Sequence, residues 1–170
     1  MPIGKATNLL LIQSENGIRA KVPSNLKSAF DRVIEAGLTV MYSPEISSRR
    51  HAFIEQSKDQ AKDAGEGAER LIKNLYAQSN KTMPEDVIVP CAMIFAFEYL
   101  DLVEKTGKAQ ITPDLVGKAT MITSQSVLQG MYGITKDHLE QIMRQHQAGQ
   151  PVTLPGAPPA KVGILSRAGA

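Results

Sequence analysis

The apolar positions of the chain are densest around residues 83–105. Nearly every residue from Val87 to Val103 is apolar, and the only charged side chains in that run are Glu98 and Asp101. A helix that is apolar on all sides has to be covered by other helices, by partner chains or by lipid. This run is somewhat shorter than the ~20 residues that a membrane span needs, and it contains Pro90. We therefore predict a buried central helix over residues 83–105.

Both ends of this helix carry sequence signals. Thr82 and Glu85 have the spacing of a capping box, in which the hydroxyl and the carboxylate satisfy backbone amides at the helix start. Gly107 is the expected stop, because glycine readily adopts the left-handed conformation that ends many helices. Three acidic residues are expected to form the helix's one polar edge: Glu98, Asp101 and Glu104.

Two short apolar runs near the N-terminus, residues 8–13 and 18–22, flank the dipeptide Asn16-Gly17. Both residues of the dipeptide tolerate positive φ, so it is typical of the tight turns in β-hairpins. The pattern predicts a small hairpin or extended arm within residues 1–23.

Helical spacing of apolar residues begins after this arm. Ser24 is the expected cap of a helix whose apolar residues recur at intervals of three and four, and Gly37 is expected to end it. A short extended segment is expected at residues 38–42. Ser43 and Pro44 then open the next helix, since proline is favoured in a first helical turn.

The stretch 45–79 is rich in charged residues, glutamine and alanine, with a recurring apolar stripe. Gly65 and Gly67 interrupt it, and a glycine costs about 1 kcal/mol relative to alanine in a helix interior. We therefore expect a break or bend near these two glycines. The charged face is expected to lie in solvent or to face a partner subunit.

Two further helices are expected after the central one. Thr112 and Thr135 each stand between an apolar residue and a first-turn acid, an arrangement that is favourable at the positive end of the helix dipole. Gly149 closes the last helix. The pattern as a whole predicts a mainly α fold, a helical bundle around a central apolar helix. It comprises an N-terminal hairpin or extended arm (1–23), a helical domain (24–149) and a Pro-rich extended tail (150–170).

The tail combines prolines and glycines with scattered apolar residues. Its segment 155–159, Pro-Gly-Ala-Pro-Pro, cannot form a helix or a β-ladder of its own. We expect the tail to dock as an extended strap on a neighbouring subunit through its apolar residues: Val152, Leu154, Val162, Ile164 and Leu165.

The composition excludes several classes of function. A formal net charge of +2 provides no whole-molecule field to attract nucleic acid or an anionic membrane. There is no tryptophan, and four tyrosines with four phenylalanines favour helix-on-helix packing over a deep ligand cavity. The single cysteine, Cys91, lies in the central apolar run and is expected to act as a small buried hydrophobe. One cysteine excludes a disulfide framework within the chain.

The sequence contains no recognisable catalytic constellation. Its three histidines, His51, His138 and His146, have no partner at metal-site spacing and no cysteine nearby. A Gly-rich phosphate loop, a nucleophile elbow and a nucleotide fingerprint are also missing from the sequence. We therefore expect a protein that is not an enzyme, with no cofactor, no bound metal and no small-molecule substrate.

One segment, residues 127–146, resembles a helix-turn-helix, with Gly133 at its turn. In a DNA reader of this kind Arg144 would contact a phosphate, and five residues would face base edges: Thr135, Lys136, His138, Gln141 and Gln145. Asp137 and Glu140 oppose this interpretation, because they would bring acids toward the DNA. Helix–glycine–helix corners are also common in proteins that bind no DNA. A helix-turn-helix DNA-binding regulator is therefore the alternative function.

The chain also resembles the small virion proteins of tailed bacteriophages. The likeness lies in its Ala-, Gln-, Lys- and Met-rich helices, its short N-terminal arm and its Pro-rich tail. It implies a non-catalytic structural subunit, either an internal or ejected protein of the genome-delivery channel or a head-tail component. Such a subunit would be made in the host cytoplasm and reside in the virion.

The same resemblance implies a homo-oligomer that forms a ring or tube around DNA and contacts other virion proteins. Contact with DNA would be non-specific, and contact with a membrane would arise only if the protein is ejected. The expected subunit contacts are the tail residues named above.

Overall fold

The structure is a computed structural model and describes residues 6–148. In this part of the chain all regular secondary structure is helical. The elements are α1 (Leu9–Lys21), the short 3₁₀ turn η1 (Ser24–Leu26), α2 (Lys27–Met41), α3 (Pro44–Gln56), α4 (Gln60–Gln78), α5 (Glu85–Lys105), α6 (Pro113–Tyr132) and α7 (Lys136–Gln147). The chain divides into two units, residues 1–133 with α1–α6 and residues 134–170 with α7. The predicted mainly α fold is confirmed.

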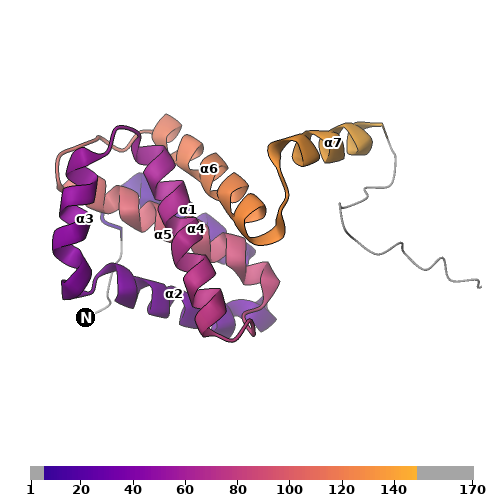
Figure 1. The fold of residues 1–170 in the computed structure, drawn as a ribbon, viewed down its shortest axis with the longest axis horizontal. Helices are drawn as coiled ribbons and strands as arrows, with labels where there is room; N and C mark the ends of the chain where they lie inside the picture. The colour runs from indigo at the N-terminus through magenta and orange to yellow at the C-terminus, as the bar shows by residue number, and fades with distance from the viewer. Residues whose placement is uncertain (1–5, 149–170) are drawn as a thin grey trace, which may run out of the picture. The chain divides into compact units, whose positions relative to one another are not determined.

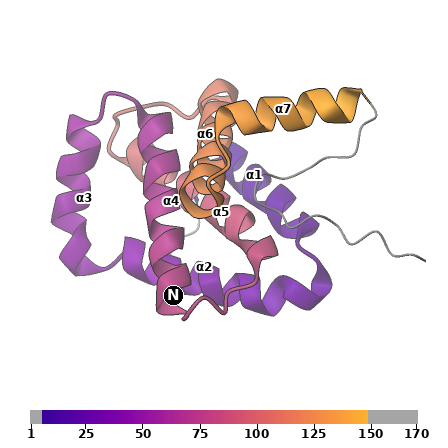
Figure 2. The same cartoon turned by 45° about the vertical axis from the view of Figure 1, so that its right-hand side comes forward.

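The predicted central helix is α5, and it lies at the core of the first unit. Helices α4 and α6 pack along each other and along α5, and α1 and α2 also contact α5 (Figures 1 and 2). Its large apolar side chains are buried on several sides of the helix, as expected for an element that other helices surround. They include Val87, Ile88, Ile94, Phe95, Phe97 and Leu100.

The predicted N-terminal hairpin is wrong, because residues 9–21 form α1 and Asn16-Gly17 lies inside it. The side chain of Asn8 caps this helix by accepting a hydrogen bond from the Leu10 amide at 2.9 Å. Leu11 is fully buried in the core, so packing against α5 and a good cap outweigh the local turn signal.

Helix α2 is longer than expected, and the extended segment predicted at 38–42 is wrong because the helix continues to Met41. Gly37 does not end it. A Cβ atom at Gly37 would lie 2.2 Å from Cζ of Phe95, so this glycine lets the ring of α5 pack directly against the α2 backbone. Ser24 was expected to cap α2 but lies in η1, and α2 has no side-chain cap.

The break expected near Gly65 and Gly67 lies instead at residues 57–59, between α3 and α4. Asp59 caps α4 by accepting from the Lys62 amide at 3.1 Å. Gly65 lies inside α4, where a Cβ atom would come within 2.6 Å of the Ile122 side chain and 2.9 Å of the Thr123 nitrogen. This glycine therefore allows close packing of α4 on α6 and does not interrupt the helix.

The helix ends follow the sequence signals in part. The capping box at Thr82 is wrong, because Pro84 precedes α5 without a side-chain cap and the Thr82 hydroxyl donates to the Ser79 carbonyl. Gly107 after α5 has the expected positive φ of 75°. Thr112 caps α6 by accepting from the Leu115 amide at 3.2 Å, as predicted.

The second unit contains α7 in its described part, residues 134–148. Gly133, the last residue of the first unit, has a φ of 67° and ends α6 in the left-handed conformation. Gly149 lies outside the described residues. So do the tail residues predicted to contact a neighbouring subunit: Val152, Leu154, Val162, Ile164 and Leu165.

Candidate protein-binding groove

An open groove of about 400 Å³ lies in the first unit between α3 and α4. The C-terminal part of α2 contributes to its lining, and Phe95 and Tyr99 of α5 belong to it as well. Helix α3 does not pack closely along any other helix of the first unit, which leaves this side of α4 accessible. Figure 1 shows α3 and α4 running side by side, with α2 crossing near their ends.

The lining of the groove is largely apolar, and part of it is exposed. The exposed fraction is 46% for Phe53, 38% for Ile46 and 36% for Val40. Phe53 makes an edge-to-face contact with Tyr99, with ring centroids 6.4 Å apart. Adjacent large apolar side chains at this level of exposure mark surfaces that bind a partner more often than inert surface.

Gly67 of α4 also lines the groove, and it is exposed. A Cβ atom at this position would have no neighbour within 4 Å. Ala64, three residues before Gly67, and Ala68, the next residue, also line the groove, and both are small and buried. This stretch of α4 therefore lets a bound segment approach the helix backbone closely.

The polar groups at the groove belong mainly to arginines. Arg50 donates to the carbonyl of Met41, and its guanidinium lies 5.6 Å from the centre of the Tyr42 ring. Arg70 pairs with Glu66 at 3.3 Å. Arg49 lines the groove without an ion pair among the described residues.

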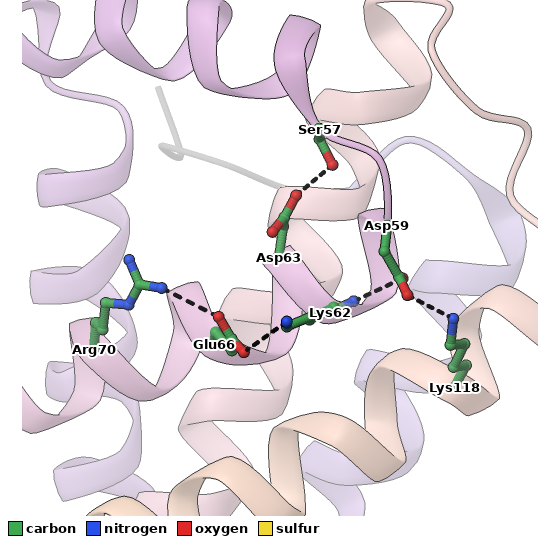
Figure 3. A network of polar contacts seen from close by, with 7 residues as sticks. All are labelled: Ser57, Asp59, Lys62, Asp63, Glu66, Arg70 and Lys118. Carbon is green, nitrogen blue, oxygen red and sulfur yellow. Dashed lines mark hydrogen bonds and ion pairs between the residues drawn. The ribbon is translucent and has the colours of Figure 1, made fainter.

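A polar network holds the start of α4 beside the groove (Figure 3). The Ser57 hydroxyl donates to Asp63, and Lys118 of α6 pairs with Asp59 at 2.8 Å. The hydrogen bond from Lys118, together with the backbone bond from Lys62, lowers the pKa of Asp59 below its usual range. These contacts fix the connection between α3 and α4, and with it the spacing of the two walls.

Two of the three acids predicted to form the polar edge of α5, Glu98 and Asp101, are buried. Glu98 is 1% exposed and accepts a hydrogen bond from the Tyr42 hydroxyl at 2.7 Å. Burial raises the pKa of Glu98 above its usual range, and the nearby charge of Asp101 adds to the rise. Burial raises the pKa of Tyr42, and its hydrogen bond to Glu98 raises it further.

Asp101 is fully buried beneath the N-terminal segment. It accepts from the Thr7 amide at 2.7 Å and from the Thr7 hydroxyl at 3.0 Å, and Lys105 lies 2.5 Å from its other oxygen. Burial alone would raise the pKa of Asp101, but Lys105 and Thr7 outweigh it and hold the pKa below its ordinary value. Glu104 accepts two hydrogen bonds from the Asn8 amide group. The acids of α5 therefore anchor the start of α1.

The residues predicted to read DNA lie on or next to α7, and several are engaged within it. The Thr135 amide donates to Nδ1 of His138 at 3.2 Å, and the His138 amide donates back to the Thr135 hydroxyl at 3.4 Å. Lys136 and Arg144 both lie near Glu140, at 3.9 and 3.7 Å. Gln141 is exposed and Gln145 is half-buried.

The other candidate residues hold no metal-like arrangement. Among residues 6–148, no group of three His, Cys, Asp or Glu side chains is placed to hold an ion. Cys91 is fully buried, its thiol lies 3.8 Å from the Phe30 carbonyl, and burial raises its pKa, as expected for a small core residue. His51 is exposed on α3. Within the same described residues no helix is both long and apolar enough to cross a bilayer.

Sequence reasoning missed the groove, although it had assigned several lining residues to helices. The exposed Phe53 and Ile46 lie on α3, and an apolar stripe in a sequence does not show which of its residues stay uncovered by other helices. Comparison with protein-family models, with curated proteins and with solved structures finds no match for this chain.

Proposed function

We propose that the protein is a non-catalytic structural subunit that works as a homo-oligomer, in the virion of a tailed bacteriophage. The observation that carries the assembly part is the open apolar groove, with Phe53, Ile46 and Val40 exposed along it. When a partner chain covers an exposed apolar surface of this kind, the free energy of the system falls. The virion setting comes from the resemblance of the whole sequence to small virion proteins. In that setting the subunit is an internal or ejected protein or a head-tail component.

The polar groups around the groove support a binding role over a catalytic one. Arg50 is bound to the Met41 carbonyl and lies over Tyr42, and Asp63 accepts from Ser57. Each of these groups already serves a contact that shapes the groove. General acid–base chemistry instead needs a titratable group that is free to reach a substrate proton.

Sedimentation velocity of the purified full chain over a hundredfold range of concentration tests the proposal. We expect oligomers that dissociate on dilution. A companion chain that lacks residues 150–170 should keep its helical circular dichroism, because the helices described here lie outside that segment, and it should assemble less. A full chain that stays monomeric at every concentration would overturn the homo-oligomeric function.

A further inference from the structure

Resting on the proposed function, we propose that the groove between α3 and α4 binds the Pro-rich segment 151–159 of a neighbouring copy. The segment reads Pro-Val-Thr-Leu-Pro-Gly-Ala-Pro-Pro. It follows α7 within the 22 residues that lie beyond the described part of the chain. The groove offers exposed apolar side chains, and the segment is rich in proline and apolar residues.

The lining of the groove matches the known chemistry of proline recognition. Pro-rich segments with prolines three positions apart dock into grooves lined by aromatic side chains, because their extended conformation is largely preformed and binding orders little. Pro155 and Pro158 have this spacing. The groove presents Phe53 and Tyr99 in edge-to-face contact, with Phe95 also in its lining.

Hydrogen-bonding groups on the two sides are also complementary. Proline has no backbone N–H, so residues 155–159 offer mainly carbonyl acceptors. The arginines of the groove, Arg49, Arg50 and Arg70, carry only donors. The segment 151–159 contains no charged residue, so these arginines do not repel it. A basic strap would instead be repelled by them.

The dimensions agree with a short extended segment. The part of α3 that lines the groove runs from Ile46 to Phe53, a wall of about 11 Å at 1.5 Å per residue. An extended Pro-rich chain rises about 3.1 Å per residue, so about four residues match that length. Pro155–Pro158 is a run of four with a proline at each end.

Contact between the groove of one copy and the tail of the next is heterologous. Such contacts generate a ring if the rotation closes and a helical tube if it does not. Both outcomes agree with the assembly that the proposed function describes.

Blocking the groove tests the inference. Gly67→Leu places a side chain where a Cβ atom has no neighbour within 4 Å, so it should fill the groove without disturbing the core. Gly117→Leu on α6 is the matched control, because Gly117 is exposed, has the same open surroundings and lies outside the groove. Phe53→Ser is a second groove variant at a side chain that is 46% exposed. The tail variant is Leu154→Ser with Pro155→Ser and Pro158→Ser.

All variants are full chains and are compared by sedimentation velocity and thermal melting. We expect Gly67→Leu, Phe53→Ser and the tail variant to weaken self-association at least tenfold. Gly117→Leu should stay within twofold of wild type. At a dilution where both chains are monomeric, Gly67→Leu should melt no lower than wild type. Mixing Gly67→Leu with the tail variant should give 1:1 complexes, because one partner keeps an intact tail and the other an intact groove.

The outcomes separate this inference from the proposed function. Wild-type oligomers that are unchanged by Gly67→Leu and by Phe53→Ser would show that the groove does not hold the tail, while the assembly function stands. Failure of the two defective chains to complement each other would likewise overturn the groove–tail contact. A monomeric wild type would overturn both proposals.

Discussion

At the scale of single residues, three glycines in helices have three different surroundings. Gly37 faces the Phe95 ring, Gly65 faces α6, and Gly67 faces the open groove. In the first two positions any side chain would force neighbouring groups apart, which typically costs about 1–3 kcal/mol. The third position accepts a side chain. Glycine therefore marks close packing at two positions and a candidate binding surface at the third.

The buried acids Glu98 and Asp101 should make the stability of the fold depend on pH in opposite directions, because the pKa of one is raised and that of the other is lowered. The pKa of Glu98 is raised by burial above the usual 4.5, so the folded state holds that proton more tightly than the unfolded state. Its contribution to stability is complete below the unfolded pKa and is lost as the pH rises through the folded pKa. Asp101, whose pKa is lowered, contributes above its unfolded pKa and loses that contribution as the pH falls through its folded pKa.

Glu98→Gln removes the titration and keeps an oxygen that can accept from Tyr42. We expect the free energy of unfolding of this variant to fall less than that of wild type as the pH rises above 4.5. Urea titrations at closely spaced pH values check it. Asp101→Asn is the comparison, because it should instead remove the loss of stability at acid pH. Parallel curves for wild type and Glu98→Gln would contradict the assignment.

At the scale of elements, helices α1 and α3 are attached to the rest of the first unit in different ways. Helix α1 is held by the Asn8 cap, by the burial of Leu11 and by hydrogen bonds from residues 7 and 8 to acids of α5. Helix α3 is attached mainly near its C-terminal end, where Ile54 is buried and Lys108 binds Glu55 at 3.0 Å. The first helix is therefore part of the core, and the third is a wall of the groove.

The helical state of residues 9–21 predicts the effect of removing its turn dipeptide. Asn16 is exposed and a Cβ atom at Gly17 has no neighbour within 4 Å, so the double change to alanine fits the helix. We expect stability to rise by about 1 kcal/mol, since alanine is the better helix former at both positions. Urea denaturation measures the change.

Gly37→Ala supplies the contrasting control, because the same kind of substitution meets the Phe95 ring and should destabilise by roughly 1–3 kcal/mol. A loss of stability in the Asn16→Ala/Gly17→Ala chain would indicate that a tight turn, and not a helix, is the folded state of this segment.

At the scale of the whole molecule, a virion subunit and the alternative, a helix-turn-helix regulator, should bind DNA differently. A regulator binds its preferred site more tightly than bulk DNA by about 4 kcal/mol or more. Thr135 and His138 cap the helix reciprocally and are not free to read bases, and the acid Glu140 lies 3.9 Å from Lys136 and 3.7 Å from Arg144, where it opposes close approach of a DNA strand.

We therefore expect binding to duplex DNA to be weak, sensitive to salt and independent of sequence. Fluorescence anisotropy with several unrelated duplexes at two salt concentrations measures it. Lys136→Ala with Arg144→Ala should lower the affinity for all duplexes alike. Preference for one sequence, lost in that double variant, would favour the helix-turn-helix regulator instead.

The helical class, the central position of α5 and some of the helix ends could be predicted from the amino-acid sequence alone. These features depend on residues that are close together along the chain. The cap at Thr112 and the helix ends at Gly107 and Gly133 depend on hydrogen bonds and backbone angles within one turn. The apolar run of α5 is continuous, so its burial follows from composition alone.

Tertiary contacts account for the helical state of α1, the roles of the glycines, the burial of Glu98 and Asp101, and the groove. Each depends on a partner far away in the sequence: Phe95 for Gly37, Ile122 for Gly65, Thr7 for Asp101. The local conformational preference of a turn dipeptide or a helix-breaking glycine amounts to about 1 kcal/mol. Burial of one large side chain contributes roughly 1.5–3 kcal/mol, so the packed neighbours prevail wherever the two disagree.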